Sequence, residues 1–292
     1  DVDRVIETAQ AMAIPADQKL LHVLPRDYII DKQNGIKEPL GMAGARLEAK
    51  VHLVTCSENS SLNILKCVTA CGLDIEAFVL EQLASSYSVL THDERELGVC
   101  LIDIGCGTTD MAVFTEGSIS FTDVIPIAGD HVTNDIAEAL RTPPSQAEDI
   151  KQRYGCAVSS LTQSEELMMV PGMGGRPERE LSREALADVL ERRYVEIFSM
   201  AQQKLSLSGF ESLIPAGVVL TGGASKVEGA IELGEEVFHA PVRLGSPNTV
   251  GGFNEVIHNP VYATAVGLLL YGHKQMQEDH MNYIHRDKNI LN

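Results

Sequence analysis

Residues 103–110 have the composition of a turn that could hold phosphate. An apolar strand reaches Asp103, and Gly105, Gly107, Thr108 and Thr109 follow before a second apolar strand. The glycines leave backbone N–H groups uncovered by a Cβ, and the threonines add hydroxyl donors, so the turn could bind phosphate oxygens. A carboxylate repels phosphate, so we expect Asp103 to act through a hydrated Mg²⁺. An ordinary β-hairpin with a glycine turn would use the same residues.

Two further signals could serve the nucleoside part of a ligand. Gly222 and Gly223 follow the predicted strand 217–221 and would let a flat ring or a sugar approach closely. A tight turn into a helix explains them equally well. Glu148 and Lys151 lie three apart on a predicted helix and therefore share a face. A solvated ion pair would show the same spacing.

Predicted helices and strands alternate along the chain around these residues, and this alternation predicts an α/β fold. Small residues at 84–86 and at 263–267 indicate two helices that cross closely, either at a hinge between lobes or in plain core packing. Helices are predicted at 1–13, 61–71, 182–207 and 260–272, from residue 145, and within 81–97, where an acidic turn ends the helix. Strands are predicted at 20–28, 46–56 and 217–221, a strand–turn–strand at 98–114, and a turn at 171–177.

The composition excludes several classes of protein. With 44% hydrophobic and 22% charged residues among 292, the chain can bury a core. A net charge of −18 excludes a broad nucleic-acid-binding face. The six cysteines form no CxxC pair, which favours reduced thiols in the cytosol. The longest apolar stretch, 261–271, is too short to span a bilayer, and we expect no signal peptide. A helical pattern already runs at Asp1, so we expect the sequence to start inside a larger protein.

The order of these signals resembles the ATPase superfamily of actin, the heat-shock chaperones and the sugar kinases. Residues 98–114 look like its second phosphate loop, and residues 217–223 like its adenosine loop. The predicted helices at 81–90 and 260–272 look like its connecting helices. Glu148 and Lys151 lie where the family's second-lobe helix reaches the nucleoside.

Within that superfamily the chain is similar to the bacterial cell-division family FtsA, from about Asp1 to Gly272. The opening 80 residues look like the extra subdomain that sets FtsA apart from actin, which argues against a chaperone or a kinase. The motifs that carry the likeness are LASSYSVL at 83–90, VCLIDIGCGTTD at 99–110, IPIAG at 125–129, TPPSQAE at 142–148, YGCA at 154–157, VLTGGA at 219–224 and TAVGLL at 264–269.

The resemblance implies a two-lobed, actin-like α/β fold with an FtsA-type extra subdomain and an incomplete first lobe. The domains expected from it are the extra subdomain at 1–80, the remaining first-lobe helices at 81–97 and 260–272, the nucleotide-binding core at 98–141 and 211–259, an outer subdomain at 142–210, and a flexible tail at 273–292.

The function implied is that of an ATP-binding scaffold that anchors the FtsZ ring to the inner face of the cytoplasmic membrane at the division site, forms filaments and helps recruit later division proteins. Glu81 lies near the family's water-orienting position and is the candidate for hydrolysis, so the protein is at most a weak ATPase. The ligands implied are ATP and Mg²⁺, and the cofactor-binding residues are Asp103 (to Mg²⁺ through water), Gly105, Gly107, Thr108, Thr109, Glu148, Lys151, Gly222 and Gly223.

Four arginines lie in the part that resembles the FtsZ-binding subdomain: Arg176, Arg179, Arg192 and Arg193. In an acidic chain, such a local basic cluster could dock the acidic C-terminal tail of FtsZ, because arginine pairs with carboxylates through two parallel hydrogen bonds. Solvated helix charge is the alternative.

The chain departs from the family pattern in several places. The family's first phosphate loop would precede Asp1. Residues 273–292 do not resemble the family's amphipathic membrane helix, so membrane contact is expected only through a helix absent from this chain. Cys106 and Gln82 replace a common Gly and a common Pro, so a positive φ is not required at Cys106 or the turn is distorted.

A small-molecule kinase or ATPase of the same superfamily is the alternative function, although no motif for a sugar pocket or a catalytic base is visible. A pure interaction module without nucleotide is a third possibility.

Overall fold

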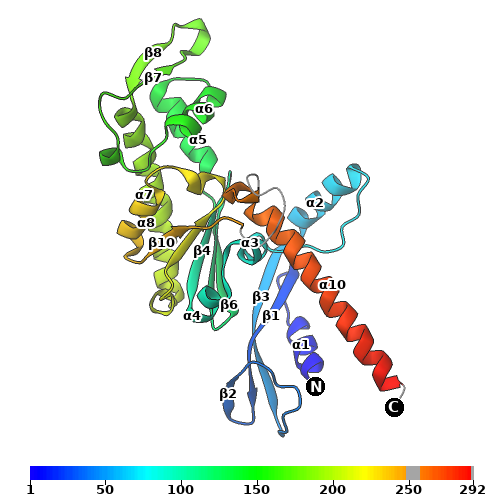
Figure 1. Ribbon diagram of the computed structural model, residues 1–292. Helices are drawn as coiled ribbons and strands as arrows, with labels where there is room; N and C mark the ends of the chain where they lie inside the picture. The colour runs from blue at the N-terminus through cyan, green and yellow to red at the C-terminus, as the bar shows by residue number, and fades with distance from the viewer. Residues whose placement is uncertain (248–256, 291–292) are drawn as a thin grey trace.

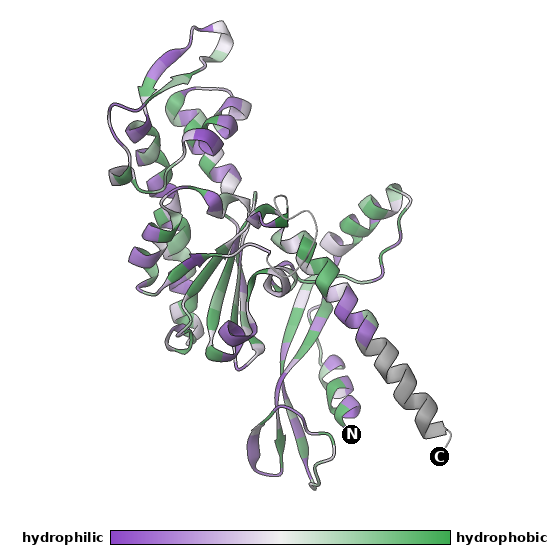
Figure 2. Cartoon of the chain, in the orientation of Figure 1, coloured by the Kyte–Doolittle hydropathy of each residue, from purple (hydrophilic) through white to green (hydrophobic). Residues whose placement is uncertain are grey.

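A five-stranded sheet forms the centre of the molecule (Figure 1). The computed structural model describes residues 1–247 and 257–290, with side chains at 1–247 and 257–277. The sheet has the order β10-β9-β4-β5-β6, in which β4 runs parallel to β9 and antiparallel to β5. Every residue of β4 and β9 is buried, and Figure 2 shows these strands in mostly hydrophobic colours. The strands are β4 (Val99–Ile104), β5 (Thr109–Thr115), β6 (Ser118–Ile125), β9 (Val218–Thr221) and β10 (Val242–Leu244).

A helical layer and a small hairpin extend from one end of this sheet. The long helix α7 begins at Ser182, whose hydroxyl accepts from the Ala185 N–H, and ends at Gly209 with a positive φ. Tyr194 and Phe198 of α7 are fully buried. The predicted turn at 171–177 is flanked by two short strands that the sequence did not indicate. The elements are α5 (Gly129–Leu140), α6 (Pro144–Tyr154), β7 (Leu167–Val170), β8 (Arg179–Ser182), α7 (Arg183–Ser208) and α8 (Ala230–Phe238), with short 3-10 turns at Ser159–Leu161, Met173–Gly175, Glu211–Leu213 and Gly223–Lys226.

The opening residues form a separate antiparallel sheet with the order β2-β1-β3. One side of helix α1 packs on this sheet through Val2, Val5 and Ile6, as the apolar spacing predicts. Helix α2 begins after Ser57, whose side chain accepts from the Ser60 N–H. The elements are α1 (Val2–Gln10), β1 (Gln18–Ile30), β2 (Gln33–Ile36), β3 (Leu47–Ser57) and α2 (Glu58–Ala70).

The helix predicted within residues 81–97 is confirmed as α3 (Glu81–Val89), but the acidic turn predicted to end it is a second short helix, α4 (His92–Leu97). Leu90 is extended, and Thr91 then caps α4 in a reciprocal arrangement with Glu94. The Thr-x-x-Glu spacing is the sequence signature of such a capping box.

Helix α10 (Ala263–Ile290) follows a 3-10 turn at Pro260–Tyr262 and crosses α3 closely. A Cβ on Gly267 would collide with the Ala84 carbonyl, and the Ser88 hydroxyl donates to the Ala263 carbonyl at 2.7 Å. The close crossing predicted from the small residues is therefore confirmed.

The predicted end of this last helix at Gly272 is wrong, because the helix continues to Ile290. The expectation of a flexible tail from residue 273 stays a prediction. Residues 273–290 contain no Gly or Pro and many good helix formers, so the backbone has no reason to stop there. Residues 291–292, and 248–256 of the predicted core, lie outside the described residues. None of the helices in the described part has both the length and the apolar character needed to cross a bilayer.

Candidate functional site

The two glycine bends that the sequence singled out meet at one edge of the central sheet. In the parallel pair β4–β9, Asp103 lies opposite Thr221, so the bends after Ile104 and after Thr221 leave the sheet side by side. Gly222 is buried with a φ of 87°, and a Cβ there would lie 2.5 Å from both the Asp103 Oδ1 and the Ile104 carbonyl oxygen. Only glycine fits this contact. The two bends therefore lie in contact at this edge of the sheet.

The first bend is a β-hairpin turn, with Asp103 opposite Asp110. Gly107 is exposed, and no atom lies within 4 Å of the position that its Cβ would take. The Thr108 hydroxyl donates to Asp110 at 2.9 Å at the surface. The buried Thr109 hydroxyl instead donates to the Ile127 carbonyl at 2.7 Å. Its hydroxyl therefore anchors the fold, and the sequence could not show that it was already engaged.

The start of helix α5 supports the outer side of this turn. The Gly129 N–H donates to the Gly105 carbonyl at 3.1 Å, and the Asp130 N–H donates to the Cys106 carbonyl at 2.8 Å. The Cys106 thiol also donates to the Asp130 carboxylate at 2.9 Å, and this hydrogen bond raises the pKa of Cys106. Cys106 has no positive φ, as its side chain requires. The turn is thus held in one position without the common glycine.

Glu148 and Lys151 lie beside the same turn rather than on a solvated face. Lys151 is largely buried and donates to the Gly129 carbonyl at 3.1 Å and the Thr133 hydroxyl at 2.8 Å. It also pairs with Glu148 at 2.6 Å. Burial opposes ionisation of Glu148, yet hydrogen bonds from Lys151, Thr133 and Gln152 hold its pKa below the usual value. The pair joins α6 to the first turn of α5, against which the hairpin turn rests.

Three carboxyl groups approach each other on the inner side of the turn: Asp103, Asp110 and Glu81, the exposed first residue of α3. The pKa of Asp103 is raised to about 7, mainly by burial and also by the charges of Glu81 and Asp110, while hydrogen bonds with Ser85 and Thr264 oppose the shift. Burial also raises the pKa values of Glu81 and Asp110, and the charge of Asp110 adds to the shift of Glu81.

The sequence analysis named Asp103 and Glu81 but missed Asp110 and Thr264. Asp110 could have been found, because a hairpin pairs the two ends of the 103–110 motif. Thr264 could not, because α10 is remote in sequence.

Among the described residues, no three His, Cys, Asp or Glu side chains are placed to hold a metal ion directly.

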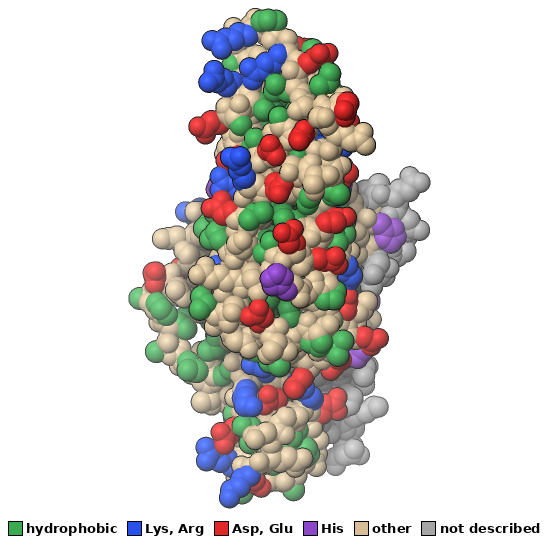
Figure 3. Space-filling model, turned by 90° about the vertical axis from the view of Figure 1, so that its left-hand side faces the viewer, with side chains coloured by type: hydrophobic (Ala, Val, Ile, Leu, Met, Phe, Trp, Pro, Cys, Tyr) green, Lys and Arg blue, Asp and Glu red, His purple; other side chains and the backbone are tan. Residues whose placement is uncertain are grey.

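The four candidate arginines do not behave alike. Arg193 is bound at 2.6 and 2.8 Å by Asp135 of α5 and at 2.6 Å by Glu196. Arg179 donates to the Leu140 carbonyl. Arg176 and Arg192 are exposed, and within the described residues neither has an ion-pair partner. Figure 3 shows basic side chains gathered near the end of the molecule that carries β7 and β8.

A pocket of about 410 Å³ lies between α5 and α7. None of the predicted nucleotide ligands lines it. It mixes two arginines with three acidic side chains, so it can receive a partner with both charges or an acidic group aimed at the exposed arginine. The lining residues are Asp135, Glu138, Ala139, Val189, Arg192, Arg193 and Glu196.

A central sheet with paired glycine bends at one edge and a close crossing of α3 and α10 places the chain in the actin-like class. MreB5 of Spiroplasma citri, solved with bound ADP, superposes with a TM-score of 0.61 at 19% identity, covering 78% of this chain and 68% of that one. A PilM–PilN type IV pilus biogenesis complex gives a TM-score of 0.64 at 17% identity, covering 93% of this chain and 71% of that one.

The sequence comparisons narrow the class to one family. The family model described as "Cell division protein FtsA" matches residues 100–267, and the model of the SHS2 domain inserted in FtsA matches residues 1–55. The FtsA protein of Pseudomonas aeruginosa is 62% identical over 97% of this chain and 67% of its own length. The chain therefore belongs to the FtsA family of actin-like cell-division proteins.

Proposed function

We propose that the protein is an ATP-binding, actin-like scaffold that anchors the FtsZ ring to the cytoplasmic face of the bacterial inner membrane at the division site. Nucleotide binding is supported by the close approach of Gly222 to Asp103, because both glycine bends then lie at one edge of the sheet. MreB5, which shares the fold, was solved with ADP. Family membership supports the division role.

In this proposal the phosphates lie against the open N–H groups around Gly107, and the nucleoside lies toward Gly222 and Gly223. Lys151 and Glu148 support the phosphate turn through α5 and approach the nucleoside side. Asp103 holds Mg²⁺ through water. Bound Mg²⁺ would neutralise phosphate charge, and its own charge would favour the ionised form of Asp103.

Hydrolysis, if present, depends on Glu81. This residue opens to solvent at the start of α3, and its raised pKa suits a group that holds or accepts a proton near neutral pH. We propose at most a weak ATPase activity, with Glu81 orienting the attacking water.

The acidic tail of FtsZ is proposed to dock at the pocket between α5 and α7. Arg192 lines this pocket and is exposed, so it is available to a partner carboxylate, with Arg176 nearby in the chain as a second exposed cation. Arg193 and Arg179 contribute by keeping α7 and β8 in place against α5. Self-association into filaments and recruitment of later division proteins through residues 1–80 complete the proposal.

The nucleotide proposal is tested by Gly107→Val in a calorimetric titration with Mg-ATP. The backbone of Gly107 needs no positive φ, so valine folds there but fills the open space of the turn. We expect ATP affinity to fall at least about tenfold, which corresponds to about 1.4 kcal/mol. The control is Gly272→Val, at an equally open position on α10, which is expected to bind ATP normally. Equal affinity in the two variants would count against the placement.

A further inference from the structure

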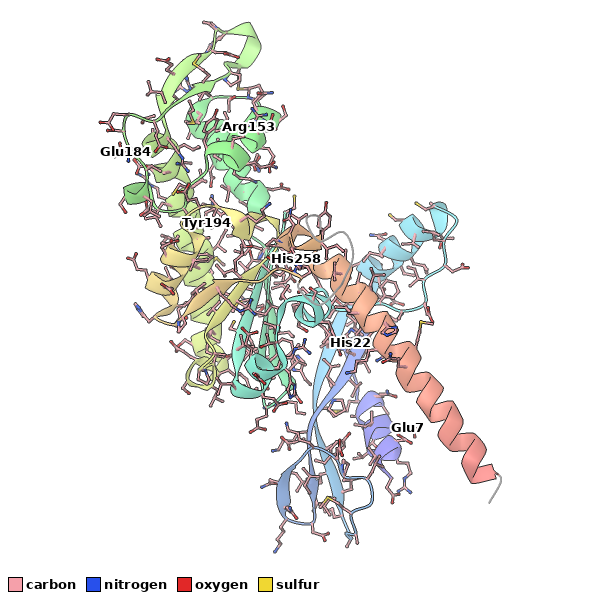
Figure 4. All side chains as sticks on the ribbon, viewed as in Figure 1. Glu7, His22, Arg153, Glu184, Tyr194 and His258 are labelled. Atoms are coloured by element: carbon pink, nitrogen blue, oxygen red, sulfur yellow. The ribbon has the colours of Figure 1, made fainter. Side chains whose placement is uncertain are left out.

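One face of the β1–β3 hairpin forms the joint between residues 1–80 and the rest of the molecule. Because Leu24 pairs with His52 in the register, the side chains of His22, Leu24 and His52 share that face. Leu24 packs against the core of the central sheet, and the His52 Nε2 lies 3.0 Å from the Thr122 hydroxyl of β6. Figure 4 shows His22 on β1 beside α10.

His22 makes a contact that fixes its own protonation state. The backbone N–H of Leu80 donates to the His22 Nε2 at 3.0 Å. A backbone N–H can only donate, so Nε2 must carry its lone pair and the ring must be neutral with its proton on Nδ1. Protonating Nε2 would aim two N–H groups at each other and break the bond.

Leu80 is the residue from which α3 starts. It is the N-cap of the helix, and its carbonyl accepts the first helical bond from the Ala84 N–H at 2.9 Å. The next residue is Glu81, whose carboxylate raises the pKa of Asp103. No side chain of the N-cap itself secures this helix start. His22 therefore holds, from the extra sheet, the backbone that places Glu81.

The surroundings of His22 favour the neutral ring. Tyr271 of α10 meets the imidazole edge-on at 6.5 Å between ring centres, and Tyr87 of α3 contacts Tyr271 at 5.6 Å. The cations of Arg95 and Lys274 both lie over Tyr87. Burial lowers the pKa of His22. Both of these charged groups are cations, so neither of them favours an imidazolium at His22.

We propose that neutral His22 is a positioning residue that sets the Glu81 carboxylate beside Asp103 and thereby couples the extra subdomain to the nucleotide site. The coupling rests on the proposed nucleotide function, whereas the link from His22 to Glu81 does not. Because coupling between two sites is reciprocal, a nucleotide that favours this arrangement of Glu81 also favours the neutral form of His22.

The test is an NMR titration of the protein between pH 5 and pH 8, following the His22 ring nitrogens, the Leu80 amide and the Glu81 side-chain carboxyl carbon. We expect His22 to carry its neutral proton on Nδ1, and the Leu80 and Glu81 signals to show a step at the pH where His22 titrates. In His22→Gln, whose amide oxygen accepts the Leu80 N–H at every pH, that step should vanish. In the matched control His52→Gln it should persist.

Mg-ATP affinity measured across the same pH range gives the second readout. Asp103 titrates in every variant, so the informative quantity is the difference between proteins. We expect His22→Gln to bind within about threefold of the unaltered protein at pH 7.5 and to lose less affinity by pH 5.5. A Glu81 signal without the step, or with the step unchanged in His22→Gln, would overturn the inference. If the unaltered protein fails to bind ATP, the proposed function is overturned. The NMR signal of Glu81 still tests the link from His22 to Glu81 in that case.

Discussion

At the scale of single residues, Asp103 lies in a position where an ionised carboxylate does not stabilise the folded protein. It is 3% exposed and shares its surroundings with Asp110 and Glu81. Desolvation and like charge both act against its ionised form, and a group so perturbed beside a glycine turn is typical of functional sites.

This placement predicts that Asp103→Asn stabilises the protein as the pH rises. The pKa of Asp103 is about 7 in the folded protein against an ordinary value of 3.8, so the folded state holds a proton that the unfolded state releases. The contribution of Asp103 to stability therefore falls between about pH 4 and pH 7. Asparagine removes that dependence, and we expect the variant to be more stable by roughly 1–3 kcal/mol at pH 8 and little changed at pH 4.

Denaturant unfolding at several pH values measures this difference. The same variant is expected to lose Mg²⁺-dependent ATP binding, because a neutral amide no longer attracts the hydrated cation. A variant that is no more stable at pH 8 than at pH 4, relative to the unaltered protein, would show that the carboxylate is not strained.

The residues of the site were predictable where backbone geometry and charge decide the role. Gly222 and Asp103 belong to this group, because a tight contact at a strand end needs glycine and an acid at the end of a buried strand needs a partner. The anchored hydroxyl of Thr109 and the contact of Thr264 with Asp103 at 3.4 Å depend on packing between remote segments, which no local pattern encodes.

At the scale of elements, the helix pair α5–α7 separates two arginines that are neighbours in sequence. Arg193 is 23% exposed and bridges Asp135 and Glu196, whereas Arg192 is exposed at the pocket. The sequence alone does not distinguish Arg192 from Arg193, because the 3.6-residue period of a helix does not say which of two adjacent side chains meets a partner helix.

We therefore predict that Arg192→Glu weakens binding of the FtsZ tail peptide at least about fivefold, or about 1 kcal/mol, and leaves the melting temperature within about 2 °C. Arg193→Glu should lower the melting temperature by several degrees, because it places three carboxylates together between α5 and α7. Peptide titration and thermal unfolding of both variants check this pair. Unchanged peptide affinity in Arg192→Glu would remove the assignment.

The element boundaries that sequence analysis placed wrongly have physical causes. The break at Leu90 arises because Thr91 and Glu94 satisfy the start of a new helix, a local signal that was present but not used. The extension of α10 to Ile290 arises because nothing in residues 273–290 stops a helix. The strands β7 and β8 have four residues each and β8 has no buried residue, so their pattern is too brief to be distinguished from a loop.

At the scale of the whole molecule, the order of motifs along the chain predicted the actin-like fold, because each motif occupies a fixed place in that topology. The domain boundaries proposed from the sequence stay predictions. The joint between residues 1–80 and the core could not be predicted, since it depends on His22, Leu24 and His52 meeting α3 and β6 across long sequence separations.

In the proposed function, the bends after Ile104 and Thr221 hold a single nucleotide between them. This placement is tested most directly by backbone amide NMR of the protein titrated with Mg-ATPγS. The amides of residues 105–109 and of residues 222–225 should shift together, with one common dissociation constant and no such change at the α5–α7 pocket. Shifts confined to one bend, or found only at the pocket, would contradict the claim.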